Sequence, residues 1–241
     1  MQLSRETSLR LKRLVRHMKP SHFVTLRIGR KVIEAFAEKV GLVYFGYVDQ
    51  HDDDHRLIRG HTVSKTHQDN HYCIGTVKGY DVILALRNDV VRLRSGKEQR
   101  CHWLIYTIDL HTTREIPHCY IGHQSHKDTY AASFHQLQPL AIGGLGRYTH
   151  AFVTNYTIYG AATHAVAIEH MITPQIAEVV ATHFQGASIE ITDGTVYVYV
   201  EQERPTEKRL EAMLSSGLWL AEAIDRVYAV PSAESKRVVT I

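Results

Sequence analysis

Residues 72–122 constrain the fold most, because short β-prone runs follow one another there with turns, not helices, between them. These runs are rich in β-branched and aromatic residues, which favour strands. Consecutive strands joined so briefly indicate an antiparallel meander and argue against βαβ units. The expected strands are 72–77, 80–87, 90–94, 102–110 and 116–122.

The first expected turn is Lys78-Gly79, a two-residue connection for which glycine is suited. A loop of this length fixes the register of the two strands beside it. It places Ile74 opposite Ile83 on one face of the hairpin. On the other face it places Cys73 opposite Leu84.

The stretch 101–126 is expected to form another hairpin, with strands 102–110 and 116–122 around the polar turn 111–115. Alternation along the first of these strands produces an apolar face around which the meander is expected to pack. That face consists of Leu104, Tyr106, Ile108 and Leu110. The same stretch carries five histidines, namely His102, His111, His118, His123 and His126.

The last third of the chain has helices between its strands. A strand at 152–159 and a short helix at 162–171 precede a helix that begins at Thr173-Pro174, an N-cap followed by proline. Asp193-Gly194 is expected to form the type I′ turn of a hairpin, and Thr206 caps a final helix. These elements predict a C-terminal βααββα unit.

Ahead of the meander, the spacing of apolar residues predicts helices at 4–18 and 27–40, with Ser4 as the N-cap of the first and Gly41 ending the second. The run 42–48 is aromatic and β-branched, so we expect a largely buried strand. The chain is therefore predicted to be an α+β protein. It combines an antiparallel β-meander with flanking helices, the βααββα unit and an N-terminal helical arm.

These elements divide the chain into a basic helical arm at 1–41, a β-rich subdomain at 42–147, an α+β subdomain at 148–230 and a tail at 231–241. The alternative is that 42–230 forms one domain. A chain of 241 residues is long enough for one full core, or for two small domains that share an interface.

A resemblance supports this architecture. Within 150–228 the chain has a strand, a helix, a Thr-Pro helix, a hairpin with an Asp-Gly turn and a long terminal helix. With the β-rich segment before it, this order is similar to a family of uncharacterised bacterial proteins, often membrane-associated, that carry a domain of unknown function. The basic arm stands where membrane-associated members have transmembrane helices. The resemblance implies the fold, and it implies no activity and no catalytic residue.

Charge is distributed unevenly along the chain. Residues 1–31 hold nine Lys/Arg and one acid, whereas the rest of the chain holds 19 basic and 24 acidic residues. Such asymmetry can mark contact with nucleic acid, an anionic membrane or an acidic partner. The alternative is a terminal helix that docks on the domain and leaves its charges solvated. The candidate residues for anionic-surface contact are Arg10, Lys12, Arg13, Arg16 and Lys19.

Histidines suggest a metal site, because eleven of the 17 lie between 51 and 135. In the polar stretch 49–71, which we expect to be a surface loop, an extended backbone would place alternate side chains on one face. No HExxH and no paired Cys/His set with zinc-ligand spacing is present, so a structural or surface role is the alternative. The candidate ligands of a divalent metal are His51, Asp53, His55, His118, His123 and His126, and no other cofactor is expected.

Other chemistries have less support. Acid/base work needs two facing carboxylates, and Asp109 and Glu190 are acids expected within strands. The pKa of Asp109 would be raised if it were buried without a partner. Cys73, Cys101 and Cys119 are expected to be inert packing residues. The sequence contains no Gly-x-Ser-x-Gly elbow.

Two functional hypotheses follow. The first is a non-enzymatic, soluble binding or scaffolding protein whose basic arm contacts an anionic membrane surface or an unknown protein partner, with nucleic acid less favoured. The second is a metal-dependent hydrolase that uses the histidine-rich segment 49–126. No apolar run reaches the ~18–20 residues that span a bilayer, and the N-terminus lacks the apolar core of a signal peptide. We therefore expect a cytoplasmic protein, either free or peripheral on a membrane.

Overall fold

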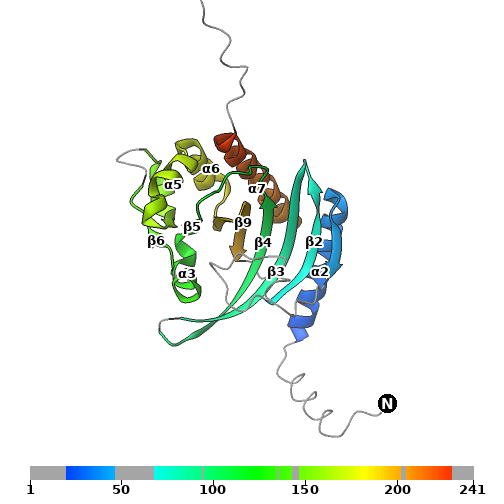
Figure 1. The fold of residues 1–241 in the computed structure, drawn as a ribbon. Helices are drawn as coiled ribbons and strands as arrows, with labels where there is room; N and C mark the ends of the chain where they lie inside the picture. The colour runs from blue at the N-terminus through cyan, green and yellow to red at the C-terminus, as the bar shows by residue number, and fades with distance from the viewer. Residues whose placement is uncertain are drawn as a thin grey trace, which may run out of the picture.

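A computed structural model describes residues 20–46, 68–93, 95–134, 136–142, 147–201 and 205–229. Their strands form one nine-stranded antiparallel sheet in the order β1-β2-β3-β4-β9-β8-β5-β7-β6 (Figure 1). The strands are β1 (Val43–Gly46), β2 (Gln68–Val77), β3 (Tyr80–Arg92), β4 (Glu98–Asp109), β5 (Cys119–His123), β6 (Gln138–Pro139), β7 (Tyr156–Gly160), β8 (Ala187–Thr192) and β9 (Thr195–Glu201).

Helices flank this sheet, with α2 beside β2 and with α5 and α6 near the opposite end of the sheet (Figure 1). The helices are α2 (Pro20–Val40), α3 (Lys127–Ser133), α4 (His150–Asn155), α5 (Ala165–Met171), α6 (Pro174–His183) and α7 (Glu207–Tyr228), with 3-10 turns η2 (Gln124–His126) and η3 (Ala162–His164). The predicted α+β class, a meander with flanking helices, is confirmed. Within the described ranges, no helix is both long and apolar enough to cross a membrane.

The meander β1-β2-β3-β4 follows the order of the chain. Lys78 and Gly79 both have positive φ, as a type I′ turn requires, and Ile74 pairs with Ile83 as predicted. Two boundaries differ from the predicted ones. The strand expected at 90–94 is the end of β3, and β2 begins at Gln68, within the stretch expected to be a loop.

The hairpin predicted at 101–126 does not form. β4 pairs with β3 on one side and with β9 on the other, whereas β5 pairs with β7 and β8. The hairpin β8-β9 therefore lies between the two strands that were expected to be neighbours. As a result, strands from 42–147 and from 148–230 interleave in one sheet.

The first face of the sheet carries the larger core. Leu104, Tyr106 and Ile108 of β4 are fully buried there, as the alternation of the sequence predicted, and Leu110 is half-buried. Helices α2, α6 and α7 contribute apolar side chains to the same core. The Tyr106 hydroxyl also donates to the Leu210 carbonyl of α7, at 3.2 Å. This face is an ordinary sheet-on-helix core.

The second face is built differently, from aromatic and polar side chains. One row of paired residues crosses all nine strands and changes in character along its length. It is apolar at the β1 edge and mixes aromatic, hydroxyl and carboxyl groups farther along. The row is Val43, Ile74, Ile83, Thr107, Tyr197, Glu190, Tyr120, Tyr159 and Pro139.

The N-terminal elements differ from their predictions in two ways. Helix α2 begins at Pro20, ahead of the expected 27–40, and it ends at Val40, directly before Gly41, whose φ is +80°. β1 was predicted to be largely buried, but Val43 is 58% and Phe45 53% exposed, because β1 is the edge strand of the sheet. The helix predicted at 4–18 lies outside the described residues.

The C-terminal unit agrees with its local signals. The Thr173 and Thr206 hydroxyls accept the backbone N–H groups of Ile176 and Arg209, so both predicted N-caps are present. Asp193 and its neighbouring glycine have positive φ, as predicted for a type I′ turn. The strand expected at 152–159 is wrong over its first half, where α4 runs to Asn155 before β7 begins.

Candidate functional site

The second face of the sheet holds most of the chemistry that the structure describes. Of the six candidate metal ligands, His118 and His126 lie on this face, beside β5 and in η2. His123, the last residue of β5, is in phase with Cys119 and Ile121 of the larger core. His51, Asp53 and His55 lie outside the described residues. Among the residues that are described, no three His, Cys, Asp or Glu side chains are grouped to hold a metal ion.

The His118 side chain bonds to a single buried carboxylate, that of Glu190. Its Nε2 lies 2.8 Å from Glu190 Oε1, and the Tyr199 hydroxyl donates to Glu190 Oε2 at 2.6 Å. The Glu190 side chain is fully buried, whereas the His118 side chain is 27% exposed. Burial, followed by the Glu190 charge, raises the pKa of Tyr199, so this phenol remains a donor.

His123 and His126 meet at a serine of β8. The Ser188 hydroxyl lies 2.7 Å from His126 Nδ1 and accepts the backbone N–H of His123 at 2.9 Å. Burial, followed by the charge of His123, lowers the pKa of His126 to about 4. His126 is therefore neutral at physiological pH. The His123 and His126 rings lie together, with centroids 5.9 Å apart.

Sequence reasoning missed the most deeply buried ion pair of the described residues, Arg87–Asp69, which lies on the same face. Arg87 donates to both carboxylate oxygens of Asp69, with Nη2 to Oδ2 at 2.8 Å, and Tyr72 donates to Oδ2 at 3.2 Å. Although burial lowers it, the Asp69 carboxylate raises the pKa of Arg87 overall. The alternation of side chains along β3 could have indicated this pair, because it places Arg87 on the same face of the strand as Ile83.

We name these side chains the buried polar cluster. It consists of Asp69, Arg87, His118, His126, Ser188, Glu190 and Tyr199. For two further buried polar atoms on this face, Trp103 Nε1 and the Tyr120 hydroxyl, the described residues supply no partner within hydrogen-bonding geometry. The edge of the Trp103 ring meets the His126 ring, with centroids 4.9 Å apart.

The Glu190–His118 pair resembles a general-base arrangement, in which a buried carboxylate orients an imidazole. Such a base also needs a nucleophile or a water-binding group on its other nitrogen. Within the described part of the chain, the His118 side chain makes one hydrogen bond, the one to Glu190. Glu190 therefore orients the imidazole, and no nucleophile from the described residues is bonded to it.

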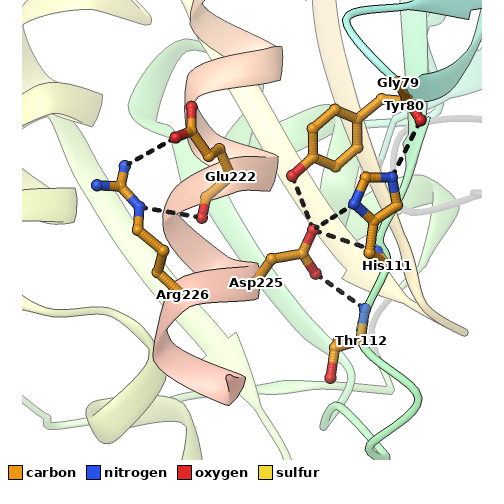
Figure 2. A network of polar contacts seen from close by, with 7 residues as sticks. All are labelled: Gly79, Tyr80, His111, Thr112, Glu222, Asp225 and Arg226. Carbon is orange, nitrogen blue, oxygen red and sulfur yellow. Dashed lines mark hydrogen bonds and ion pairs between the residues drawn. The ribbon is translucent and has the colours of Figure 1, made fainter. Parts of the chain in front are cut away.

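A second polar node joins the sheet to α7 (Figure 2). Asp225 Oδ2 accepts the Tyr80 hydroxyl at 2.9 Å and the His111 N–H at 3.2 Å, and Oδ1 accepts the Thr112 N–H at 3.0 Å. The His111 ring stacks on Tyr80, with centroids 4.1 Å apart, and its Nε2 lies 3.1 Å from the Gly79 carbonyl oxygen. Asp225 thus fixes the β2-β3 turn and the segment after β4 against one helix.

The remaining candidate side chains behave as packing or surface groups. Cys73, Cys101 and Cys119 are fully buried, and burial is the largest cause that raises the pKa of each thiol. Asp109 is exposed and accepts the Thr195 hydroxyl at 2.8 Å, so it does not face Glu190 as an acid/base partner. Arg10, Lys12, Arg13, Arg16 and Lys19 lie outside the described residues.

Comparisons with known proteins bear on the fold alone. No family model matches the chain, and no curated protein shows significant similarity to its sequence. The fold is similar to the crystal structure of the mycobacterial trehalose monomycolate transport factor A, TtfA, with a TM-score of 0.55 and 10% sequence identity. The match covers 82% of this chain and 93% of TtfA. At this identity the likeness concerns the fold.

Proposed function

We propose that this protein is a non-enzymatic binding or scaffolding protein whose basic N-terminal arm contacts an anionic surface or partner. The observation that carries this proposal is the charge asymmetry, nine basic residues against one acid in residues 1–31 and a mildly acidic remainder. Phosphate and carboxylate groups attract such a segment over about a Debye length, ~8–10 Å at physiological salt.

The structure supports the proposal through α2, which forms the C-terminal half of the predicted arm at 1–41. Ile33, Phe36 and Ala37 of α2 are buried in the core, and Lys39 binds Glu207 and Glu211 of α7. The five candidate contact residues at 10–19 therefore precede a helix that is packed on the core. A surface bound by the arm would hold the whole domain close to it.

The fold comparison adds a weaker reason. TtfA, whose fold is similar, is named as a transport factor. In this chain the charged groups of the buried polar cluster largely bond to one another, which fits a binding protein better than an enzyme. In the buried polar cluster, the Asp69 and Glu190 carboxylates are occupied by Arg87, His118 and Tyr199.

The test compares vesicle binding by the full chain with binding by two variants that lose equal charge. One variant replaces the arm residues by glutamine, and the matched control replaces five exposed basic residues of the body. The arm variant is R10Q/K12Q/R13Q/R16Q/K19Q, and the control is R92Q/K97Q/R100Q/R114Q/K127Q.

We expect co-sedimentation with phosphatidylglycerol vesicles at low salt to be lost in the arm variant and kept in the control. Added salt should release the full chain, because exposed charges are screened. Equal binding by both variants would refute a role specific to the arm. If deletion of residues 1–19 makes the protein insoluble, the arm belongs to the core and the proposal fails.

The metal-dependent hydrolase is the second candidate, and one observation favours it. A carboxylate on one imidazole nitrogen is the usual outer contact of a metal-bound histidine, and Glu190 makes this contact to His118. Metal content after chelation and reloading, compared between the wild type and the variants His118→Ala and His123→Ala, tests the idea. Unchanged stoichiometry in both variants would remove it.

A further inference from the structure

The two edges of the sheet are protected unequally. β6, at one edge, has only two residues and contains Pro139, which lacks a backbone N–H. Short strands and proline are devices that prevent another strand from adding to an edge. β1, at the other edge, is Val43–Gly46. Its register with β2 shifts between Tyr44 and Gly46, and it has neither proline nor a charged residue.

β1 also exposes apolar side chains. Val43 is 58% exposed and Phe45 is 53% exposed, which makes Phe45 the one aromatic residue among the large hydrophobic side chains exposed in the described part of the chain. Val43 lies opposite Ile74, which lies opposite Ile83, and both isoleucines are half-buried. A side chain placed beside Val43 would extend this apolar row by one strand.

The strand is held rigidly in place. The Tyr44 hydroxyl bonds to His71 Nδ1 at 2.7 Å, and its ring packs on the larger core. The Arg30 guanidinium lies 5.8 Å from the centre of the same ring. A strand that is already ordered loses little conformational entropy when a partner adds to it.

Charge near β1 indicates what kind of partner fits. Arg30 and Lys31 are exposed on α2, which contacts β1, and they are the last two of the nine basic residues in 1–31. Glu34 pairs with Arg30 and offsets part of this charge. Two copies joined edge to edge through β1 would bring Arg30 and Lys31 of both copies to the same edge, which like charge disfavours. The same positive charges would attract an acidic partner and repel a second copy of the chain.

We propose that the edge of β1 that no described strand pairs with binds an extended polypeptide segment that carries alternating apolar residues and acidic flanks, adding it to the nine described strands. Main-chain hydrogen bonds would supply affinity, and the exposed Val43 and Phe45 would select apolar residues at alternate positions. This site deepens the proposed binding function. It uses a surface different from the one that the vesicle experiment tests.

The probe is a short fluorescein-labelled peptide of alternating valine and threonine with aspartates at both ends, and its control carries lysines instead. Binding to the full chain is measured by fluorescence anisotropy. The neutral variants Val43→Ser and Phe45→Ser test the edge, and Val166→Ser, which alters a residue 69% exposed on α5, is the matched control. Hydrogen exchange of the 43–46 amides reports strand addition directly.

We expect the acidic peptide to bind, to slow exchange at 43–46, and to bind about tenfold more weakly to Phe45→Ser than to Val166→Ser. The lysine peptide should bind more weakly than the acidic peptide to the wild type and to each variant. Equal affinity of the two serine variants, or no binding of either peptide, would overturn the proposal. A dimer in sedimentation that Phe45→Ser converts to a monomer would also overturn it, by assigning the edge to a second copy.

The two proposals fail separately. Loss of vesicle binding in the arm variant with unchanged peptide binding supports both. If the arm variant keeps vesicle binding while Phe45→Ser still loses the peptide, the arm's role is wrong and the edge site stands. If peptide affinity depends on the arm and not on Phe45, the edge site is wrong.

Discussion

Replacing Arg87 by methionine should destabilise the protein severely, because it removes one half of a buried ion pair. The Arg87 side chain is 0% exposed and that of Asp69 is 1% exposed, so neither charge has access to bulk water. The loss of one partner from such a pair costs about 3–5 kcal/mol of unfolding free energy, since it leaves the other charge buried and uncompensated. Asp69→Asn should cost a similar amount for the same reason.

The double variant separates the cost of an orphaned charge from the worth of the pair. Arg87→Met together with Asp69→Asn leaves neither charge of the pair in place, and the Tyr72 hydroxyl keeps an acceptor at position 69. We therefore expect the double variant to lose about 2 kcal/mol, far less than the sum of the single losses.

Urea unfolding followed by circular dichroism measures these free energies, and thermal melts give a second reading. For a domain of this size, each kcal/mol lowers Tm by about 2–4 °C, so the single variants should melt roughly 6–20 °C below the wild type. Single losses under about 1 kcal/mol, or a double variant whose loss equals the sum, would refute the claim that these two charges are buried and coupled.

Three further outcomes are expected. Because the pKa of His126 is lowered to about 4 from 6.5, the folded state binds fewer protons than the unfolded state, so the unfolding free energy falls as pH drops from 6.5 to 4, by up to about 3 kcal/mol. Urea unfolding from pH 7 to 4.5 should show this fall, and His126→Gln should reduce it. The same pH dependence in the wild type and the variant would contradict the prediction. Native thiols should react with Ellman's reagent only after denaturation, because burial raises the pKa of Cys73 to about 12 and that of Cys101 to about 11; rapid native labelling would argue against this. Asp225→Asn should lower the unfolding free energy measured in urea by about 2–3 kcal/mol, because hydrogen bonds to the carboxylate are lost. Glu222→Gln, which alters an exposed ion pair, should lower it by under about 0.5 kcal/mol. Similar losses in the two variants would disprove the role of Asp225.

Some of the candidate site could be predicted, and some could not. His123 and His126, two of the candidate ligands, meet because a single 3-10 turn carries the chain from one to the other. Glu190 was identifiable as an acid in a strand, but its partner His118 is 72 residues away, and no local pattern links the two. Asp225 was hidden for the same reason, since it lies on α7 and binds a segment more than a hundred residues earlier.

The sequence by itself determined the elements whose geometry depends on a few adjacent residues. The turns Lys78-Gly79 and Asp193-Gly194 require positive φ, and each sets the register of its own hairpin. Thr173 and Thr206 begin their helices because a hydroxyl there accepts an otherwise unpaired N–H. Such signals are local, so tertiary context does not change them.

Only the tertiary structure decided which hairpins became neighbours. β4 could pair with β5 or with β9, and β9 offers seven paired residues along β4, from Thr195 to Glu201, whereas β5 has five residues in all. Closing a longer loop adds little entropy cost, because that cost grows only with the logarithm of loop length. The longer ladder and its packing on α7 therefore outweigh closeness in sequence. The same choice buried Glu190 beside His118, and with β1 at the edge of the sheet it left Val43 and Phe45 exposed.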